Sequence, residues 1–456
     1  MSEPKWPHTT RLAEYSAEFA YEALPPKAVS VAKDVTLDTL GALFGAWPDR
    51  CPTSAIIGDH VKEMGGRPEC TVLGMEAKSS APQAALVNAT MGYAADIEGG
   101  GVSRMHLAAV AVPTALVMAE RGRLSGRRFL AALALAYDIA SRVSDACRTD
   151  HSYPHSFHPS AVFGTFGAAA LAGHGLGLSA DEFVNAYGLA GNTAGGLVAW
   201  VDDPTEHSRS YGIGMAAYHG VSAALLAGRG FGGPRGVFDA MKYNIFEAFS
   251  GEMRLEELER DLGSDFRITH ADGFKRHPCC GDIHSGIDAL LHLLDGEGVG
   301  WREIETITHR VKTTRRPIID ANPLRSHCSQ YILAIAAVER EIRPGDILRD
   351  RRDEPAVRHV ADRVTLIGEP ELDGAAGAAP AIIEVVTSDG RSFSKRVDYA
   401  RGRSENPLTR DELEAKFIRW AEPVVGEPRA REIIDVVRDI ESLPDVSELI
   451  GLMQGR

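Results

Sequence analysis

The hydrophobic pattern of this chain changes twice along its length, and these changes constrain the fold more than any other feature. From residue 10 to about 265, apolar residues recur at helical spacing in segments rich in Ala, Leu and Gly, such as RRFLAALALAYDIASRVSDAC at 127–147. From about 270 to 403, runs of alternating apolar and polar residues appear, and helical spacing returns after 404. The pattern predicts a mainly α protein that consists of a large all-helical domain and an inserted, smaller α+β lid domain.

Local signals support this division into 1–269, 270–403 and 404–456. Ser179 and Glu182, and later Thr409 and Glu412, stand at the spacing of a helix capping box. Between them, IETITHRVKTT alternates as a strand does, and AIIEVVTSDGRSFSKRV contains Asp389-Gly390, a strong hairpin signal. We expect the C-terminal helices of 404–456 to return to the helical domain, and a cleft to form where the two domains meet.

Composition narrows the class of protein. Lys and Arg number 49 against 63 Asp and Glu, a net charge of −14, which has the wrong sign for a general nucleic-acid binder. The longest apolar run, LAAVAVPTALVMA at 107–119, is too short to cross a membrane and contains proline. The first residues lack the basic segment and apolar run of a secretory signal, so we expect a cytoplasmic protein with no nucleic-acid or membrane partner.

The stretch KRHPCCGDIH at 275–284 concentrates ligand-type side chains, and raises metal binding, redox chemistry and anion binding as alternatives. Adjacent cysteines seldom chelate one tetrahedral metal, because their side chains diverge along an extended backbone. The six cysteines of the chain also lack the local spacing of an iron–sulfur cluster. We therefore interpret Cys279 and Cys280 as small wall residues, with a reactive role for Cys280 as the alternative, and the cations Lys275 and Arg276 as candidates for holding an anion.

Three other segments place His and charged residues beside Gly or Pro, in loop-like positions that often carry binding and catalytic residues. In YAADIEGGGVSRMHLAAV, Asp96, Glu98 and His106 bracket glycines that allow close approach of a ligand. In SFHPSAVFGTFGAAA, His158 precedes a proline at a helix start, which favours an anion. In DDPTEHSRSYGIGMAAYHG, Arg209 precedes a helix expected to begin near Gly214.

Each of these residues also has a purely structural interpretation. A histidine at an apolar helix start is often a buried or capping residue, and Asp96 is a possible helix cap. Glu98 is equally consistent with a solvated surface residue that has no catalytic role. Lys275 and Arg276 are consistent with surface ion pairs that contribute little to stability.

The ordered set of these segments resembles the MmgE/PrpD family over nearly the whole chain. The resemblance is carried by VTLDTLGALFGA, AALVNATMGYAADIE, FHPSAVFGTFGAAALAG, GMAAYHGVSAALLAGRGFGGPRGVFD, KRHPCCGDIHSGIDALL, SHCSQYILAIAA and NPLTRDELEAKF. It implies a helical domain with a lid inserted before the C-terminal helices, a homodimer, and no metal or organic cofactor. It also implies an active site between the domains that binds a small polycarboxylate.

Residue by residue, the resemblance assigns catalytic roles to Asp96, His106, His158 and Lys275. The candidate substrate-binding residues are Arg209, Arg276, Cys280, Glu98 and His284. Where decarboxylase members of the family carry lysine, threonine, histidine and tyrosine, this chain has Arg209, Gly100, Cys280 and Thr313. These differences argue against decarboxylation of cis-aconitate, because neither a thiol nor a threonine replaces a proton donor of different pKa and reach.

The expected chemistry is that of a cofactor-independent lyase of the dehydratase type, acting on a small hydroxy di- or tricarboxylate. Removal of a proton next to a carboxylate builds an anion that fixed cations stabilise, here Arg209, Lys275 and Arg276. His106 and His158 are the candidate base and acid. The alternatives are an epimerase, isomerase or decarboxylase of a related polycarboxylate, and an inactive family member that binds a carboxylate.

Overall fold

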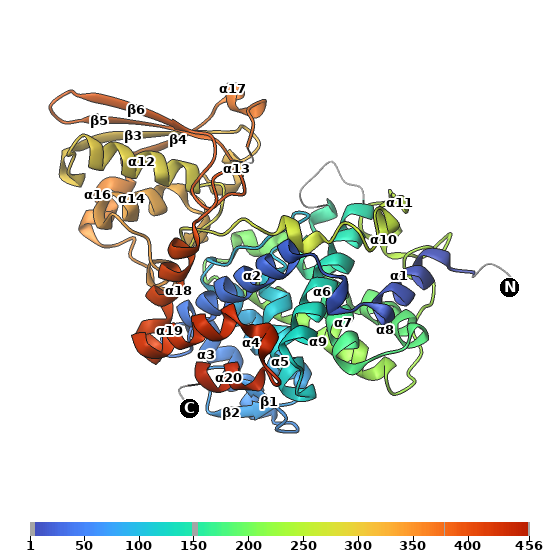
Figure 1. The fold of residues 1–456 in the computed structure, drawn as a ribbon. Helices are drawn as coiled ribbons and strands as arrows, with labels where there is room; N and C mark the ends of the chain where they lie inside the picture. The colour runs from blue at the N-terminus through green and yellow to red at the C-terminus, as the bar shows by residue number, and fades with distance from the viewer. Residues whose placement is uncertain (1–4, 148–153, 378, 455–456) are drawn as a thin grey trace.

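The computed structural model describes residues 5–147, 154–377 and 379–454, and shows a large helical body that carries a smaller α+β domain (Figure 1). The helices of the body before the second domain are α1 (Pro7–Glu18), α2 (Pro26–Gly45), α3 (Pro52–Met64), α4 (Ala81–Ala94), α5 (Ala108–Gly122), α6 (Gly126–Ala146), α7 (Pro159–Leu176), α8 (Ala180–Thr193), α9 (His207–Ala227), α10 (Ile245–Phe249) and α11 (Glu256–Glu259). The predicted fold class, mainly α with an added α+β domain, is confirmed.

The centre of the body is formed by α4, α5, α7 and α9, which pack against one another. Helix α7 is buried along nearly its whole length, as expected of a helix that is apolar on every side. Glycines on α9 allow the close approach: a Cβ on Gly220 would lie 2.5 Å from the Cβ of Ala168 on α7, and one on Gly214 would lie 2.1 Å from Thr90 Oγ1 on α4. The Gly- and Ala-rich composition is therefore a packing requirement of the body.

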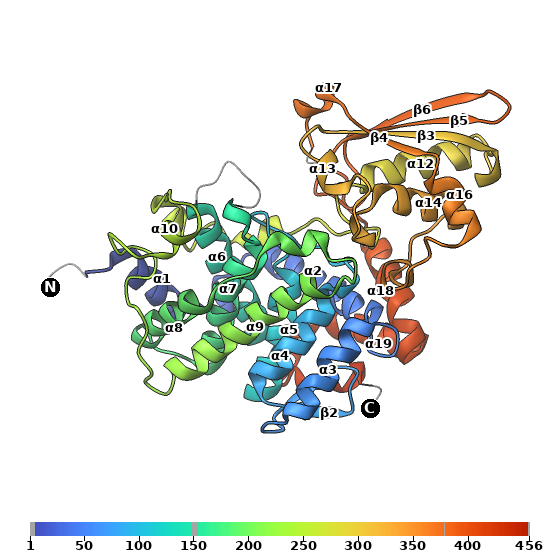
Figure 2. The ribbon, with the colours of Figure 1, turned by 180° about the vertical axis from the view of Figure 1, so that it is seen from behind.

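The second domain has one mixed sheet of strand order β4-β3-β5-β6. Its elements are α12 (His284–Gly296), β3 (Ile304–Val311), α13 (Arg316–Ile319), α14 (Ser329–Glu339), α15 (Pro344–Leu348), α16 (Pro355–Ala361), β4 (Val364–Gly368), α17 (Pro370–Asp373), β5 (Ala381–Thr387) and β6 (Ser392–Val397). Strands β5 and β6 form the hairpin predicted at Asp389-Gly390, where Gly390 has a φ of +88°. Helices α12 and α14 cover one face of the sheet (Figure 2), and together they bury a separate hydrophobic core.

The chain then returns to the helical body through α18 (Arg410–Val425), α19 (Glu427–Arg438) and α20 (Ser447–Met453). Helix α18 packs against α2, and the buried residues of all three helices belong to the core of the body. The capping boxes predicted at Ser179 and Thr409 are both present, with each serine or threonine side chain accepting from the backbone N–H of Glu182 or Glu412.

Two details differ from the sequence-based expectations. The helical body also contains a small antiparallel pair of strands, β1 (Cys70–Val72) and β2 (Ala77–Ser79), too short to give a periodic signal. The helix expected to begin near Gly214 begins at His207, so Arg209 lies inside its first turn and does not precede it. The start was misplaced because the N-cap residue Glu206 adopts a left-handed conformation, with a φ of +66°, which its residue type does not announce.

No helix of the described residues is both long enough and apolar enough to span a lipid bilayer.

Candidate active site

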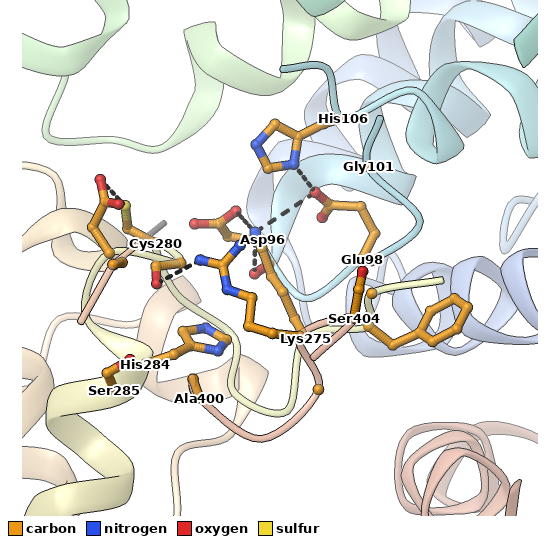
Figure 3. Close-up of a pocket in the computed structure, with 18 of the residues that line it drawn as sticks. Asp96, Glu98, Gly101, His106, Lys275, Cys280, His284, Ser285, Ala400 and Ser404 are labelled. Atoms are coloured by element: carbon orange, nitrogen blue, oxygen red, sulfur yellow. Dashed lines mark hydrogen bonds and ion pairs between the residues drawn. The ribbon is translucent and has the colours of Figure 1, made fainter. Parts of the chain in front are cut away.

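A cavity of about 500 Å³ lies at the junction of the two domains. Three stretches supply most of its wall: 96–106 after α4, 273–285 on the first crossing between the domains, and 398–405 on the second. Figure 3 shows side chains from all three converging on one space. The cleft expected between the domains therefore exists, and both crossings of the chain line it.

Backbone hydrogen bonds join the three stretches. The N–H of Gly100 donates to the carbonyl of Gly273 at 2.7 Å, and the N–H of Phe274 donates to the carbonyl of Gly402 at 2.7 Å. A Cβ on Gly99 would lie 2.4 Å from the Cα of Phe274, so this contact requires glycine. The cavity wall is thus a continuous, closely packed backbone assembly from distant parts of the sequence.

Asp96 is the centre of the buried charge cluster. Its Oδ1 lies 2.5 Å from Lys275 Nζ and 3.3 Å from an Arg209 Nη, and its backbone is left-handed with a φ of +53°. Burial alone would raise the pKa of Asp96, but the charges of Arg209 and Lys275 outweigh it and hold the pKa well below its usual range. Asp96 is therefore an ionised anchor for two cations, and it is a poor proton acceptor.

Lys275 extends from the first domain crossing into this cluster. Besides Asp96 Oδ1, its Nζ bonds the Asp96 carbonyl at 3.1 Å and lies 3.7 Å from Glu98 Oε1. Burial would lower the pKa of Lys275, but Asp96 and Glu98 raise it above its ordinary value. Lys275 consequently stays a cation at neutral pH.

Glu98 and His106 form a carboxylate–imidazole pair at the cavity wall, with His106 Nδ1 2.7 Å from Glu98 Oε1 (Figure 3). Glu98 is fully buried, whereas the His106 side chain is 37% exposed. The backbone N–H of His106 donates to Ser160 Oγ on α7 at 2.9 Å, which fixes the residue. The bond to Glu98 favours the tautomer protonated on Nδ1, and this leaves the Nε2 lone pair available to a ligand.

Three of the predicted site residues are not on the cavity wall. Arg209 is almost fully buried behind Asp96, with its guanidinium 4.2 Å from the Tyr93 ring centroid and 3.6 Å from Glu206. His158 is buried as the N-cap of α7, between the rings of Tyr93 and Trp200. Arg276 does not line the cavity, and its side chain is 53% exposed and lies 3.9 Å from Asp288.

Burial also changes the pKa of His158. Desolvation, helped by the nearby charges of His106 and Arg209, lowers the pKa of His158 to about 3. The imidazole is therefore neutral at physiological pH, which argues against the acid role expected for it.

Cys280 and His284 do line the cavity. Burial raises the pKa of the Cys280 thiol, so it is not a reactive thiolate at neutral pH. His284 Nε2 lies 3.3 Å from the carbonyl oxygen of Cys279, and burial, then the charge of His277, lowers its pKa well below the ordinary value. Among the described residues no three His, Cys, Asp or Glu side chains are grouped to hold a metal ion.

Most residues of the cavity wall were not predicted, and two of them, His327 and Arg403, carry groups that can bind an anion or transfer a proton. His327, just before α14, lies with its ring centroid 5.5 Å from that of Trp200 and with Nδ1 2.8 Å from Ser326 Oγ. Arg403 follows the hairpin of the second domain. His327 belongs to the SHCSQYILAIAA stretch used for the resemblance, but no spacing rule relates it to Asp96. Arg403 stands in a turn-rich charged run that is typical of a solvated loop.

The fold and the site together define a two-domain helical protein with a buried ionic cavity at the domain junction. Family comparison identifies the class: residues 10–258 match the MmgE/PrpD N-terminal domain and residues 277–442 match the MmgE/PrpD C-terminal domain. The chain belongs to the MmgE/PrpD family.

The relatives that it resembles are cis-aconitate decarboxylases or similar proteins. The cis-aconitate decarboxylase-like protein oryM of Aspergillus oryzae is 26% identical, covering 100% of this chain and 98% of that protein. The human cis-aconitate decarboxylase is 26% identical over 95% of this chain and 91% of its own length. The Aspergillus terreus cis-aconitate decarboxylase is 25% identical over 98% and 95%.

Proposed function

We propose that this protein is a cofactor-independent lyase of the dehydratase type that acts on a small hydroxy di- or tricarboxylate. The observation that carries the proposal is the pairing of His106 with the buried Glu98, beside the cation Lys275, on the wall of a cavity of suitable size for such a molecule. Family membership and the printed activities of the relatives support a polycarboxylate substrate.

His106 is the base in this proposal. Its Nε2 removes a proton from the carbon next to a substrate carboxylate, and the Glu98 carboxylate stabilises the imidazolium that results. Lys275 stabilises the anion that develops on the substrate, because a fixed cation is already in place before the charge appears. The imidazolium then returns its proton to the departing β-hydroxyl, so that water leaves and a C=C bond forms.

The other predicted residues take supporting roles. Arg209 and Asp96 hold Lys275 and the 96–106 stretch in position, His158 packs behind the cavity, and Cys280 and His284 shape its wall. Arg276, exposed and outside the cavity, drops out of the proposed binding set.

Decarboxylation is the second candidate, and the names of the relatives favour it. Of the positions at which this chain differs from decarboxylase members, Cys280 lines the cavity, whereas Thr313 donates its hydroxyl to Asp373 at 2.6 Å on the surface. His106 is then the candidate proton donor for the decarboxylated carbon, because burial lowers the pKa of the other cavity histidine beside Trp200, His327, to about 3. Epimerisation and carboxylate binding without turnover remain the further alternatives.

The test is incubation of the protein in deuterated water with a panel of hydroxylated and unsaturated di- and tricarboxylates. Dehydration yields an unsaturated product without CO₂, decarboxylation releases CO₂, and epimerisation exchanges deuterium without net loss of substrate. His106→Gln should lower turnover on the order of 10²-fold or more, because it keeps a hydrogen-bonding side chain but removes the basic ring nitrogen. Near-normal turnover in that variant would exclude His106 as the base.

We also propose a homodimer. Among the described residues, seven of the nine large hydrophobic side chains that are exposed fall between 197 and 253, a stretch that contains α9, and such exposure is typical of an interface. They are Leu197, Tyr211, Leu226, Phe231, Met241, Tyr243 and Met253. Light scattering at micromolar concentration should give twice the mass of one chain, and a single-chain mass would contradict the dimer.

A further inference from the structure

Arg403 lies on the cavity wall, and no carboxylate of the described residues 5–147, 154–377 and 379–454 forms an ion pair with it. Arg315 pairs with Asp282 at 3.8 Å, and Arg401 pairs with Glu412. Arg403 makes a single side-chain hydrogen bond, from Nη2 to the carbonyl of Gly281 at 3.0 Å. A half-buried guanidinium bound only to one carbonyl has donors left for a ligand.

Lys275 and Arg209, by contrast, already have carboxylate partners within the protein. Asp96 and Glu98 surround Lys275, and Asp96 and Glu206 surround Arg209. These two cations cannot also neutralise every charge of a substrate with two or three carboxylates. A second positive position on the wall is needed, and among the described residues Arg403 meets that need.

The backbone holds Arg403 in place before any ligand binds. Its own N–H donates to the carbonyl of Ala400 at 3.1 Å, and its carbonyl accepts from the N–H of Asn406 at 2.9 Å. The preceding Gly402 has a φ of +97°, and a Cβ there would lie 2.0 Å from the carbonyl oxygen of Phe274. The stretch that carries Arg403 is thus held against the stretch that carries Lys275, so the backbone positions of the two cations are set before a ligand binds.

We infer that Arg403 binds a carboxylate of the substrate other than the one beside the abstracted proton, and thereby restricts the site to molecules with at least two carboxylates. This inference rests on the proposed function for the position of the reacting carbon. The planar guanidinium offers two parallel N–H donors, which match a carboxylate in a way that a lysine ammonium does not.

The experiment measures binding, so it does not depend on turnover. The full-length protein is titrated calorimetrically with citrate, tricarballylate, succinate and butyrate. Arg403→Met should weaken binding of the first three about 10- to 100-fold, the loss expected for a charge-assisted pair, and leave butyrate within about 3-fold. Arg403→Lys should retain part of the affinity. The matched control is Arg391→Met, which removes an exposed arginine in the β5–β6 turn and should change nothing.

The inference is wrong if Arg403→Met binds citrate, tricarballylate and succinate as tightly as the natural protein does. It is also wrong if Arg403→Met loses affinity for butyrate by the same factor as for the three polycarboxylates. Finally, it is wrong if the natural protein binds no di- or tricarboxylate at millimolar concentration. A selective loss in Arg403→Met, in a protein that turns over none of the panel, would support Arg403 as the carboxylate-binding residue while rejecting the lyase. Circular dichroism and thermal unfolding of both variants separate loss of the contact from loss of the fold.

Discussion

A buried ion pair outside the cavity holds the peptide groups on either side of Glu98. Lys416 on α18 contacts Asp38 Oδ1 on α2 at 2.5 Å and also donates to the carbonyl of Ile97 at 2.9 Å. Asp38 Oδ2 accepts from the N–H of Gly99 at 2.6 Å. Both side chains are less than a tenth exposed. We therefore predict that the pair determines both the stability of the body and the position of Glu98.

The perturbation is Lys416→Met, which keeps most of the apolar side chain but leaves Asp38 buried without a counter-charge. Breaking a buried pair in this way costs about 3–5 kcal/mol, because the remaining charge is desolvated and uncompensated. The double variant Lys416→Met/Asp38→Asn removes that charge and keeps an oxygen acceptor for Gly99. It should recover at least half of the loss, since replacing both members of a buried pair is often close to neutral.

Urea unfolding at pH 8 and pH 5 measures these free energies. Burial raises the pKa of Asp38, although Lys416 lowers it in opposition, so removal of Lys416 raises the pKa further. A carboxyl whose pKa is higher in the folded state than in the unfolded state gains stability as the pH falls, and the cost of Lys416→Met should therefore be smaller at pH 5 than at pH 8. Turnover should fall in the single variant because Glu98 shifts. A cost below about 1 kcal/mol, outside the range for a broken buried pair, or no recovery in the double variant, would refute this reasoning.

Three further predictions follow from the same geometry. His158→Gln should change turnover by less than about 10-fold and leave the pH profile unchanged, because the buried, neutral imidazole does not reach the cavity; a 10²-fold loss would restore it as an acid–base group. Burial lowers the pKa of His309 on β3 to about 3, so the unfolded state binds a proton that the folded state does not as the pH falls from 6.5 to 5. The protein should therefore lose about 2 kcal/mol of unfolding free energy over this range because of His309. Urea unfolding of His309→Gln should show a pH dependence that is shallower by that amount. Exhaustive chelation should leave turnover unchanged, and a loss that zinc or iron restores would contradict the cofactor-independent chemistry proposed here.

Local sequence signals were sufficient for the elements that depend on neighbours in the chain. The hairpin at Asp389-Gly390 and the capping boxes at Ser179 and Thr409 form as predicted, because each is decided within a few residues. Asp96, Glu98 and His106 were found for a similar reason, since they lie close together on one glycine-rich stretch. Lys275 was predicted because the stretch 275–284 concentrates polar and charged side chains.

The residues that sequence reasoning missed depend on contacts between distant segments. Arg403 reaches the cavity because Gly402 permits the close approach to Phe274, and no periodicity relates these two stretches. The burial of a charged residue was also not predictable from its type. Arg209 and Arg276 are both arginines in polar stretches, yet Arg209 is buried in an ion pair with Asp96, whereas Arg276 is exposed to solvent. A charge in a sequence indicates a possible ligand, but only packing decides whether it faces one.

Arg209 holds two carboxylates whose backbones are strained. The two carboxylates that it contacts, Asp96 and Glu206, both belong to residues in the left-handed region, with φ values of +53° and +66°. Each such residue costs on the order of 1 kcal/mol or more and persists only when its surroundings enforce it. Glu206 is further fixed by the N–H and hydroxyl of Ser326, at 2.8 and 2.9 Å, from the second domain. A guanidinium has enough donors to hold both carboxylates at once and still bond the carbonyl of Tyr93, whereas an ammonium is a single point charge. The charge that resembles a substrate-binding group in the sequence is therefore used to hold the 96–106 stretch and the second domain in the arrangement that forms the cavity.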